Sequence, residues 1–141
     1  MSRGLGDVYK RQDMPINHKV FLAQFDAIKK LASEGPCVMV GRCADYALSE
    51  YKDCFSVFVH ADTDWRINRL SQKHNKTAKE AKDMINKTDK SRSSYYNYYT
   101  NKKWGAASSY NLCVDSSKLG IDGAAKAIIQ AIEIFDSIKN K

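Results

Sequence analysis

Basic and aromatic residues are interleaved within residues 84–104, MINKTDKSRSSYYNYYTNKKW. Five cations against one acid, Asp89, give this stretch a net charge of +4, out of +7 for the whole chain. Cations attract phosphate and aromatic rings stack on bases, so the ligand is expected to be one nucleotide or a nucleic acid strand. The residues concerned are Lys87, Lys90, Arg92, Lys102 and Lys103, with Tyr95, Tyr96, Tyr98, Tyr99 and Trp104.

Each of these residue types also has a purely structural explanation. Asp89 and Arg92 have the spacing of a surface ion pair on a helix, which is the favoured explanation for the two residues alone. The flanking Lys87 and Lys90 make a ligand-binding role about as well supported as the ion pair. The four tyrosines cannot all contact a ligand, because neighbours on a helix diverge by about 100°. For each tyrosine, packing in the core is favoured over stacking on a base.

Arg42 lies just beyond a predicted strand. Cys37-Val38-Met39-Val40 is a short apolar run that predicts a strand buried on both faces. Because Gly41 and Arg42 follow it directly, the guanidinium is expected in the crevice at the strand end, where it can grip phosphate through two hydrogen bonds. A surface arginine is the less favoured alternative. Asp45 is the nearest carboxylate.

Other polar residues near strand ends are weaker candidates. Arg66 and Arg69 lie on a helix after the second predicted strand, where arginines are more often solvated, and Arg66 is the better candidate of the two. Asp115-Ser116-Ser117 closes the third strand, and capping of the following helix is favoured there over a ligand contact.

Alternating helices and strands are expected to position these residues. Asp62 or Thr63 is a suitable helix cap, and Thr77 with Glu80 has the spacing of a capping box. Three short apolar strands separated by helices predict an α/β fold with a parallel sheet. Helices are expected over 17–33, 44–50, 64–74, 78–99 and 121–139, and strands over 37–40, 55–60 and 110–115. The last helix is expected to bury Ala124, Ile128, Ile129, Ile132 and Phe135.

Composition predicts a single cytoplasmic domain. No run approaches the roughly 20 apolar residues of a membrane span, and no signal segment opens the chain. The four cysteines form no C-x-x-C pair and are not clustered with the histidines, so reduced thiols are favoured over disulfides or a zinc site. No metal site is predicted.

Residues 1–12, MSRGLGDVYKRQ, are set apart from the fold. DVYKRQ resembles the translation of a transposon adapter used in sequencing libraries, so we expect a disordered scar there and a native chain that begins upstream of Asp13. Without residues 1–12 the net charge is +5.

Four segments occur in the order typical of one enzyme family: PCVMVGRCADYAL at 36–48, VFVHADTDWRINRL at 57–70, KTDKSRSSYYNYYTNKKWG at 87–105 and YNLCVDSSKLGI at 110–121. The chain resembles the cytidylate-kinase-like family of nucleoside monophosphate kinases over about residues 17–138. This resemblance implies a P-loop kinase fold, a three-layer α/β/α sandwich, over residues 13–141, with a lid-like helix at about 78–104. It also implies transfer of the ATP γ-phosphoryl group to CMP or dCMP with Mg²⁺.

The resemblance implies roles for individual residues in the first of two motifs. Gly41 and Arg42 match a G-R-D turn whose arginine binds the acceptor phosphate. Cys43 replaces the aspartate that binds the nucleoside, so Asp45 is the substitute implied. Arg42 and Asp45 are therefore expected to bind substrate.

In the second motif, the lid pattern R-x-x-x-D-x-x-R, Asp89 and Arg92 match the last two positions and are also expected to bind substrate. Ile85 takes the place of the first arginine, and Lys87 is expected to supply its charge. Lys87 and Arg92 are the expected catalytic cations.

The sequence contains no G-x-x-x-x-G-K-[ST] loop for triphosphates. The family's loop and first strand are expected to precede residue 13, with that strand lying between strands 37–40 and 55–60. We therefore expect a fragment without kinase activity and with an incomplete sheet. The alternatives are a single-stranded nucleic-acid-binding module, which is less favoured, and a degenerate regulatory relative.

Overall fold

The computed structural model describes residues 10–139, which divide into two compact units. The helical unit comprises the chain up to Cys54 together with Lys90–Trp104, and the sheet unit comprises Phe55–Asp89 and the chain from Gly105 onward. Helix α4 (Ala78–Thr100) begins in the sheet unit and ends in the helical unit. Each unit is described by itself.

The helical unit is built on α1 (Lys10–Ser33) and the short helix α2 (Ala44–Ala47). Helix α1 begins at Lys10 and not near Asn17; of the expected scar over residues 1–12, residues 1–9 lie outside the described part. Ile28 of α1 packs with the buried side chains of Ala44, Ala47 and Leu48. The partly buried side chains of Phe25, Ala32, Met39 and Cys54 surround this core.

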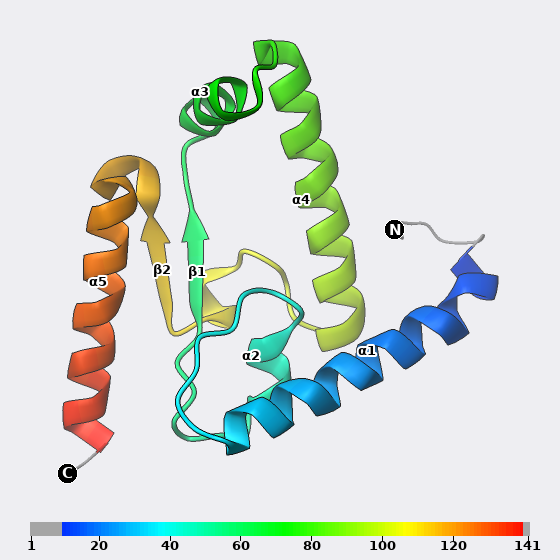
Figure 1. Ribbon diagram of the computed structural model, residues 1–141, viewed down its shortest axis with the longest axis vertical. Coiled ribbons are helices and arrows are strands. Elements are labelled where there is room, and N and C mark those ends of the chain that lie inside the picture. Colours follow the sequence, from blue (N-terminus) through cyan, green and yellow to red (C-terminus); the bar gives the residue numbers. More distant parts are fainter. Residues whose placement is uncertain (1–9, 140–141) are drawn as a thin grey trace. The chain divides into compact units, whose positions relative to one another are not determined.

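The sheet unit contains two parallel strands, β1 (Val57–His60) and β2 (Leu112–Asp115). Val57 pairs with Leu112 and His60 with Asp115, so both strands end at the same edge (Figure 1). Helix α3 (Thr63–His74) follows β1, and a 3-10 turn, η1 (Ala107–Ser109), precedes β2. The predicted parallel α/β pairing of these two strands is confirmed.

Helix α5 (Ser116–Lys139) follows β2 without a loop and packs against both strands. Its backbone breaks at Gly120, where φ is 74° and ψ is 169°, so the regular helix resumes at the predicted start, Ile121. Ala124 is buried and Phe135 packs on Phe55 with ring centroids 5.2 Å apart. The expected burial of Ile129 and Ile132 is wrong, because their side chains face solvent.

The first predicted strand, over residues 37–40, is not present in the described chain. Its Val38 and Val40 are 93% and 90% exposed, and the sheet that the structure describes has two strands, β1 and β2. A strand needs a neighbour to satisfy its backbone and a cover for its side chains. Residues 37–40 have no neighbouring strand among the described residues, and Val38 and Val40 have no cover, although Met39 packs against the helical core. The three-stranded sandwich is therefore replaced by a mostly helical α/β structure with a two-stranded sheet.

Helix α4 starts with the capping box that the sequence predicts. The Thr77 hydroxyl accepts a hydrogen bond from the Glu80 amide at 3.1 Å, and the Glu80 carboxylate accepts one from the Thr77 amide at 2.9 Å. Hydrogen bonding to the carboxylate from the Thr77 backbone, and then from the Thr77 side chain, lowers the pKa of Glu80, because it stabilises the charged form. The cap of α3 is confirmed as Asp62, whose carboxylate accepts from the Trp65 amide at 3.2 Å.

Replacing the cap hydroxyl should destabilise α4 at its first turn. We expect Thr77→Ala to lower the free energy of unfolding by about 1 kcal/mol, because the Glu80 amide loses its acceptor. Thr88→Ala, at an exposed interior position of the same helix, is the control and should change stability by less than about 0.5 kcal/mol. Urea unfolding followed by circular dichroism measures both, and equal effects of the two substitutions would contradict the capping role.

Candidate functional site

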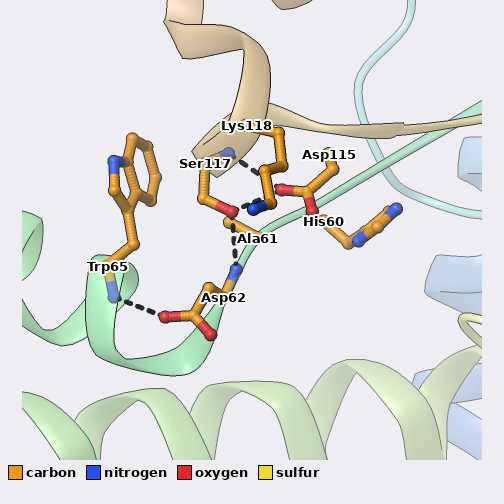
Figure 2. Close-up of a pocket in the computed structure, with 7 residues that line it drawn as sticks. All are labelled: His60, Ala61, Asp62, Trp65, Asp115, Ser117 and Lys118. Atoms are coloured by element: carbon orange, nitrogen blue, oxygen red, sulfur yellow. Dashed lines mark hydrogen bonds between the residues drawn. The ribbon is translucent and has the colours of Figure 1, made fainter.

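A cavity of the sheet unit lies at the ends of β1 and β2. It has a volume of about 470 Å³, which is within the roughly 300–1,000 Å³ typical of small-molecule pockets. Figure 2 shows Trp65 and His60 on opposite sides of Ser117. The cavity is lined by His60, Ala61, Asp62, Trp65, Asp115, Ser117 and Lys118. This is the edge of a parallel sheet at which α/β proteins bind ligands.

The two carboxylates that line this pocket, Asp62 and Asp115, accept hydrogen bonds from backbone amides of the helices that follow the strands. Asp115 accepts hydrogen bonds from the Ser117 amide at 2.9 Å and from the Ser117 hydroxyl, and the hydroxyl contact is the main cause of the lowered pKa of Asp115. The Ser117 hydroxyl also accepts from the Asp62 amide at 3.0 Å, which joins the two strand ends. The expectation that Asp115-Ser116-Ser117 is a capping turn is confirmed.

The indole of Trp65, the imidazole of His60 and the ammonium of Lys118 are the other groups that line the cavity. A flat aromatic wall with two groups that can be cationic suits a base or a phosphate. None of these three residues belongs to a motif that the sequence reveals. Their shared signal is position, since each lies within five residues of the end of a strand.

Asp89 forms an ion pair with a partner that the sequence did not indicate. The Arg66 guanidinium donates two hydrogen bonds to its carboxylate, at 2.8 and 2.9 Å, with about a third of each side chain exposed. This two-pronged geometry joins α3 to α4 within the sheet unit. The Asp89 pair is thus with Arg66 and not the helical pair with Arg92.

The turn Gly41-Arg42-Cys43 has left-handed backbone throughout. The φ angles are 72°, 58° and 56°, and the Ala44 amide closes the turn on the Gly41 carbonyl at 3.2 Å. Side chains other than glycine pay roughly 1–2 kcal/mol each for this conformation, which persists only where the surroundings enforce it. Arg42 is exposed, as an anion-binding arginine needs to be, while Cys43 is buried.

Asp45 is tied into the same unit by two hydrogen bonds. One carboxylate oxygen accepts from the Tyr96 hydroxyl at 2.7 Å, and the other accepts from the Tyr46 amide at 2.9 Å. Burial, and then the charge of Asp45, raises the pKa of the Cys43 thiol to about 12. Asp45 and Tyr96 therefore connect the arginine turn to the last turns of α4.

The tyrosines of α4 pack mainly within the helical unit. Tyr96 is buried, and Tyr99 stacks on Phe21 with ring centroids 4.1 Å apart. Tyr95 donates to Gln24 at 3.3 Å, and burial raises the pKa of its hydroxyl to about 12. Core packing is confirmed for these three tyrosines, whereas Tyr98 is more than half exposed.

The remaining predicted site residues are distributed over the two units. Arg42, Asp45 and Arg92 belong to the helical unit, and Lys87 and Asp89 belong to the sheet unit. Lys87 and Arg92 are exposed, whereas Ile85, the residue in place of the lid pattern's first arginine, is buried. An apolar side chain at position 85 therefore serves the core.

The family is decided by a match over most of the chain. A sequence model of the cytidylate kinase-like family matches residues 1–118. This chain belongs to the cytidylate kinase-like family. The resemblance seen in the four sequence segments is thus confirmed.

A solved relative of this kinase-like chain has the same fold. It is the crystal structure of an uncharacterized protein from Eubacterium ventriosum, with a TM-score of 0.79 and 33% sequence identity. The likeness covers 83% of this chain and 74% of that one. No curated protein matches the sequence.

Two further properties apply to residues 10–139 of this family member. No helix there is long and apolar enough to cross a membrane. All four cysteines are free thiols, and the described residues contain no group of three or more metal-binding side chains.

The fork, the pair of hydrogen bonds from the Arg66 guanidinium to the Asp89 carboxylate, should give a measurable coupling in the free energy of unfolding. A double-mutant cycle with Arg66→Ala and Asp89→Ala is expected to give about 1 kcal/mol of coupling in unfolding free energy, which falls as salt is added. Arg69→Ala, on the same helix, paired with Asp89→Ala is the control and should give no coupling. Additive effects of the first two substitutions would show that the fork contributes nothing.

The thiols should differ sharply in reactivity. With a pKa of about 12, Cys43 is thiolate in roughly one molecule in ten thousand at pH 8, because its raised pKa keeps the proton on. The exposed Cys37 is the internal control, and we expect iodoacetamide to alkylate it at least a hundredfold faster. Peptide mass spectrometry over time measures both rates, and similar rates would mean that the turn opens freely.

Proposed function

We propose that this family member, in its full-length form, is a nucleoside monophosphate kinase that acts on CMP, dCMP or a similar acceptor. The observation that carries the proposal is the cavity of about 470 Å³ at the ends of two parallel strands, in a chain of the cytidylate kinase-like family. Its fold would then be the P-loop sandwich, in which residues 37–40 contribute a further strand.

The reaction requires little covalent chemistry from the protein. An oxygen of the acceptor phosphate bonds to the γ-phosphorus of ATP, the bond from that phosphorus to the β-γ bridging oxygen breaks, and ADP leaves with the electron pair. Catalysis is then mostly positioning and neutralisation of charge. Exposed cations near the reacting phosphates are the groups that supply both.

Four residues have roles in this proposal. Arg42 binds the acceptor phosphate, since it is exposed at a turn whose strained backbone fixes its direction. Lys87 and Arg92 neutralise charge on the transferred group. Asp89, oriented by Arg66, contacts the acceptor nucleoside through the lone pairs that the fork leaves available.

The cavity of the sheet unit is assigned to the base of the phosphoryl donor. Its Trp65 indole offers a stacking surface, and Lys118 offers a cation for a phosphate or a base acceptor. The family also implies Mg²⁺ with ATP. Asp62 and Asp115 already accept hydrogen bonds from the protein, and residues 10–139 contain no group of three or more metal-binding side chains, so these two carboxylates do not by themselves form a Mg²⁺ site.

Binding of single-stranded nucleic acid is the less favoured function. It requires exposed aromatic rings along α4, but Tyr95, Tyr96 and Tyr99 pack within the helical unit. One largely exposed tyrosine, Tyr98, is a poor platform for successive bases.

Activity should depend on a triphosphate loop that these 141 residues do not contain. We expect coupled assays with ATP to give turnover of CMP or dCMP by a version extended with the upstream coding sequence, and none by the 141-residue chain. Absence of turnover with every nucleoside monophosphate by the extended version would overturn the proposed function.

Arg42 should determine the affinity for the acceptor. In the extended version, Arg42→Met is expected to raise the KM for CMP at least about tenfold, since two charge-assisted hydrogen bonds to phosphate are lost. Arg69→Met removes an equally charged side chain that lies against Trp65 and is the matched control for the acceptor KM. An unchanged KM in Arg42→Met would remove Arg42 from the acceptor site.

A further inference from the structure

Both carboxylate oxygens of Asp45 accept hydrogen bonds from residues of the helical unit. Tyr96 donates its hydroxyl hydrogen to one oxygen at 2.7 Å, and the Tyr46 amide donates to the other at 2.9 Å. Tyr96 is 6% exposed, so its hydroxyl is held within the packed part of the helical unit. These contacts are the expected ones for a carboxylate that fixes local structure.

The buried residues of the turn follow Arg42, and the Gly41 carbonyl before it accepts from the Ala44 amide. Val40 and Gly41 are exposed, while Cys43 and Ala44 are buried. Amides of Tyr46 and Ala47 both donate to the Cys43 carbonyl at 3.0 Å, which continues the turn into α2. The left-handed conformation of Arg42 and Cys43 is therefore enforced from the side on which Asp45 lies.

We propose that Asp45 and Tyr96 form a positioning pair that holds Arg42 in its anion-binding geometry, and that Asp45 does not contact the sugar of the acceptor. The anion-binding role of Arg42 rests on the proposed function. The structural half of the inference, that Asp45 and Tyr96 support the turn, does not. It assigns Asp45 to the support of the arginine turn, and it assigns Tyr96 of α4 to the acceptor site without a ligand contact.

A consequence for specificity follows from the same contacts. Cys43 is buried and uncharged, and Asp45 is engaged on both oxygens. Unlike Asp89, which is 28% exposed beside a similarly exposed Arg66, Asp45 is held against the hydroxyl of the buried Tyr96. We therefore expect the turn to offer the acceptor one guanidinium and no carboxylate for a sugar hydroxyl. Ribose and deoxyribose acceptors should be bound equally well by this turn.

Substitutions at Asp45 and Tyr96 distinguish support of the arginine turn from a direct contact between Asp45 and the ligand. Tyr96→Phe removes the hydroxyl and leaves the Asp45 carboxylate in place, whereas Asp45→Ala removes both hydrogen bonds. Asp45→Asn keeps an acceptor for the Tyr46 amide and a donor for the Tyr96 oxygen, so it should restore the turn. Tyr51→Phe, at a partly exposed tyrosine of the same unit, is the matched control.

Amide hydrogen exchange of the 141-residue chain tests the structural half without a ligand. We expect the Ala44, Tyr46 and Ala47 amides to exchange at least about fivefold faster in Tyr96→Phe and Asp45→Ala, and at the wild-type rate in Asp45→Asn and Tyr51→Phe. Amides of α1, in the same helical unit, report whether that unit is folded in each variant. Unchanged exchange at these three amides in a folded Tyr96→Phe would overturn the positioning pair.

Titration with CMP and dCMP tests the functional half. Tyr96→Phe and Asp45→Ala should weaken both ligands by the same factor, about tenfold, and leave the ratio of the two Kd values at its wild-type value near one. A selective loss of CMP affinity in Asp45→Ala would show that Asp45 contacts the sugar and would overturn its positioning role. If the wild-type chain binds neither nucleotide, the acceptor function of Arg42 fails, and the exchange result still decides the positioning pair.

Discussion

Parallel pairing of β1 with β2 determines what the sheet unit presents to a ligand. The register brings His60 level with Asp115, so two segments 55 residues apart end at one edge. Their following helices must start there too, and the Asp62 amide donates a hydrogen bond to the Ser117 hydroxyl across that edge. Residues that line the cavity are thus also the residues at which α3 and α5 begin.

Four acidic residues near the candidate sites form hydrogen bonds that hold the structure. Asp62 and Asp115 cap helices, Asp89 holds Arg66, and Asp45 holds Tyr96. The exposed cations at the candidate sites are Arg42, Lys87, Arg92 and Lys118. A protein that must bind phosphate gains from this division, because carboxylates engaged in hydrogen bonds with the protein are stabilised where they lie.

Local features were predictable from the sequence, and long-range partners were not. The capping box at Thr77 and the cap at Asp62 were predictable, since each depends on residues within one turn. The pair of Arg66 with Asp89 depends on how two helices pack, which no spacing reveals.

The apolar run at 37–40 shows the complementary failure. Apolar β-branched residues favour a strand, but whether a strand forms depends on a partner that lies elsewhere in the fold. The same limit applies to α5, where Ile129 and Ile132 follow the helical period and yet face solvent.

The exposed valines at 38 and 40 also have an energetic meaning. Full burial of a valine side chain stabilises a protein by roughly 1.5 kcal/mol or more, and both side chains are at least 90% exposed. About 3 kcal/mol of hydrophobic free energy is therefore unrealised in this short segment. A β-strand that covers both side chains gains that free energy on docking, a substantial part of the 5–15 kcal/mol that typically separates folded from unfolded chains.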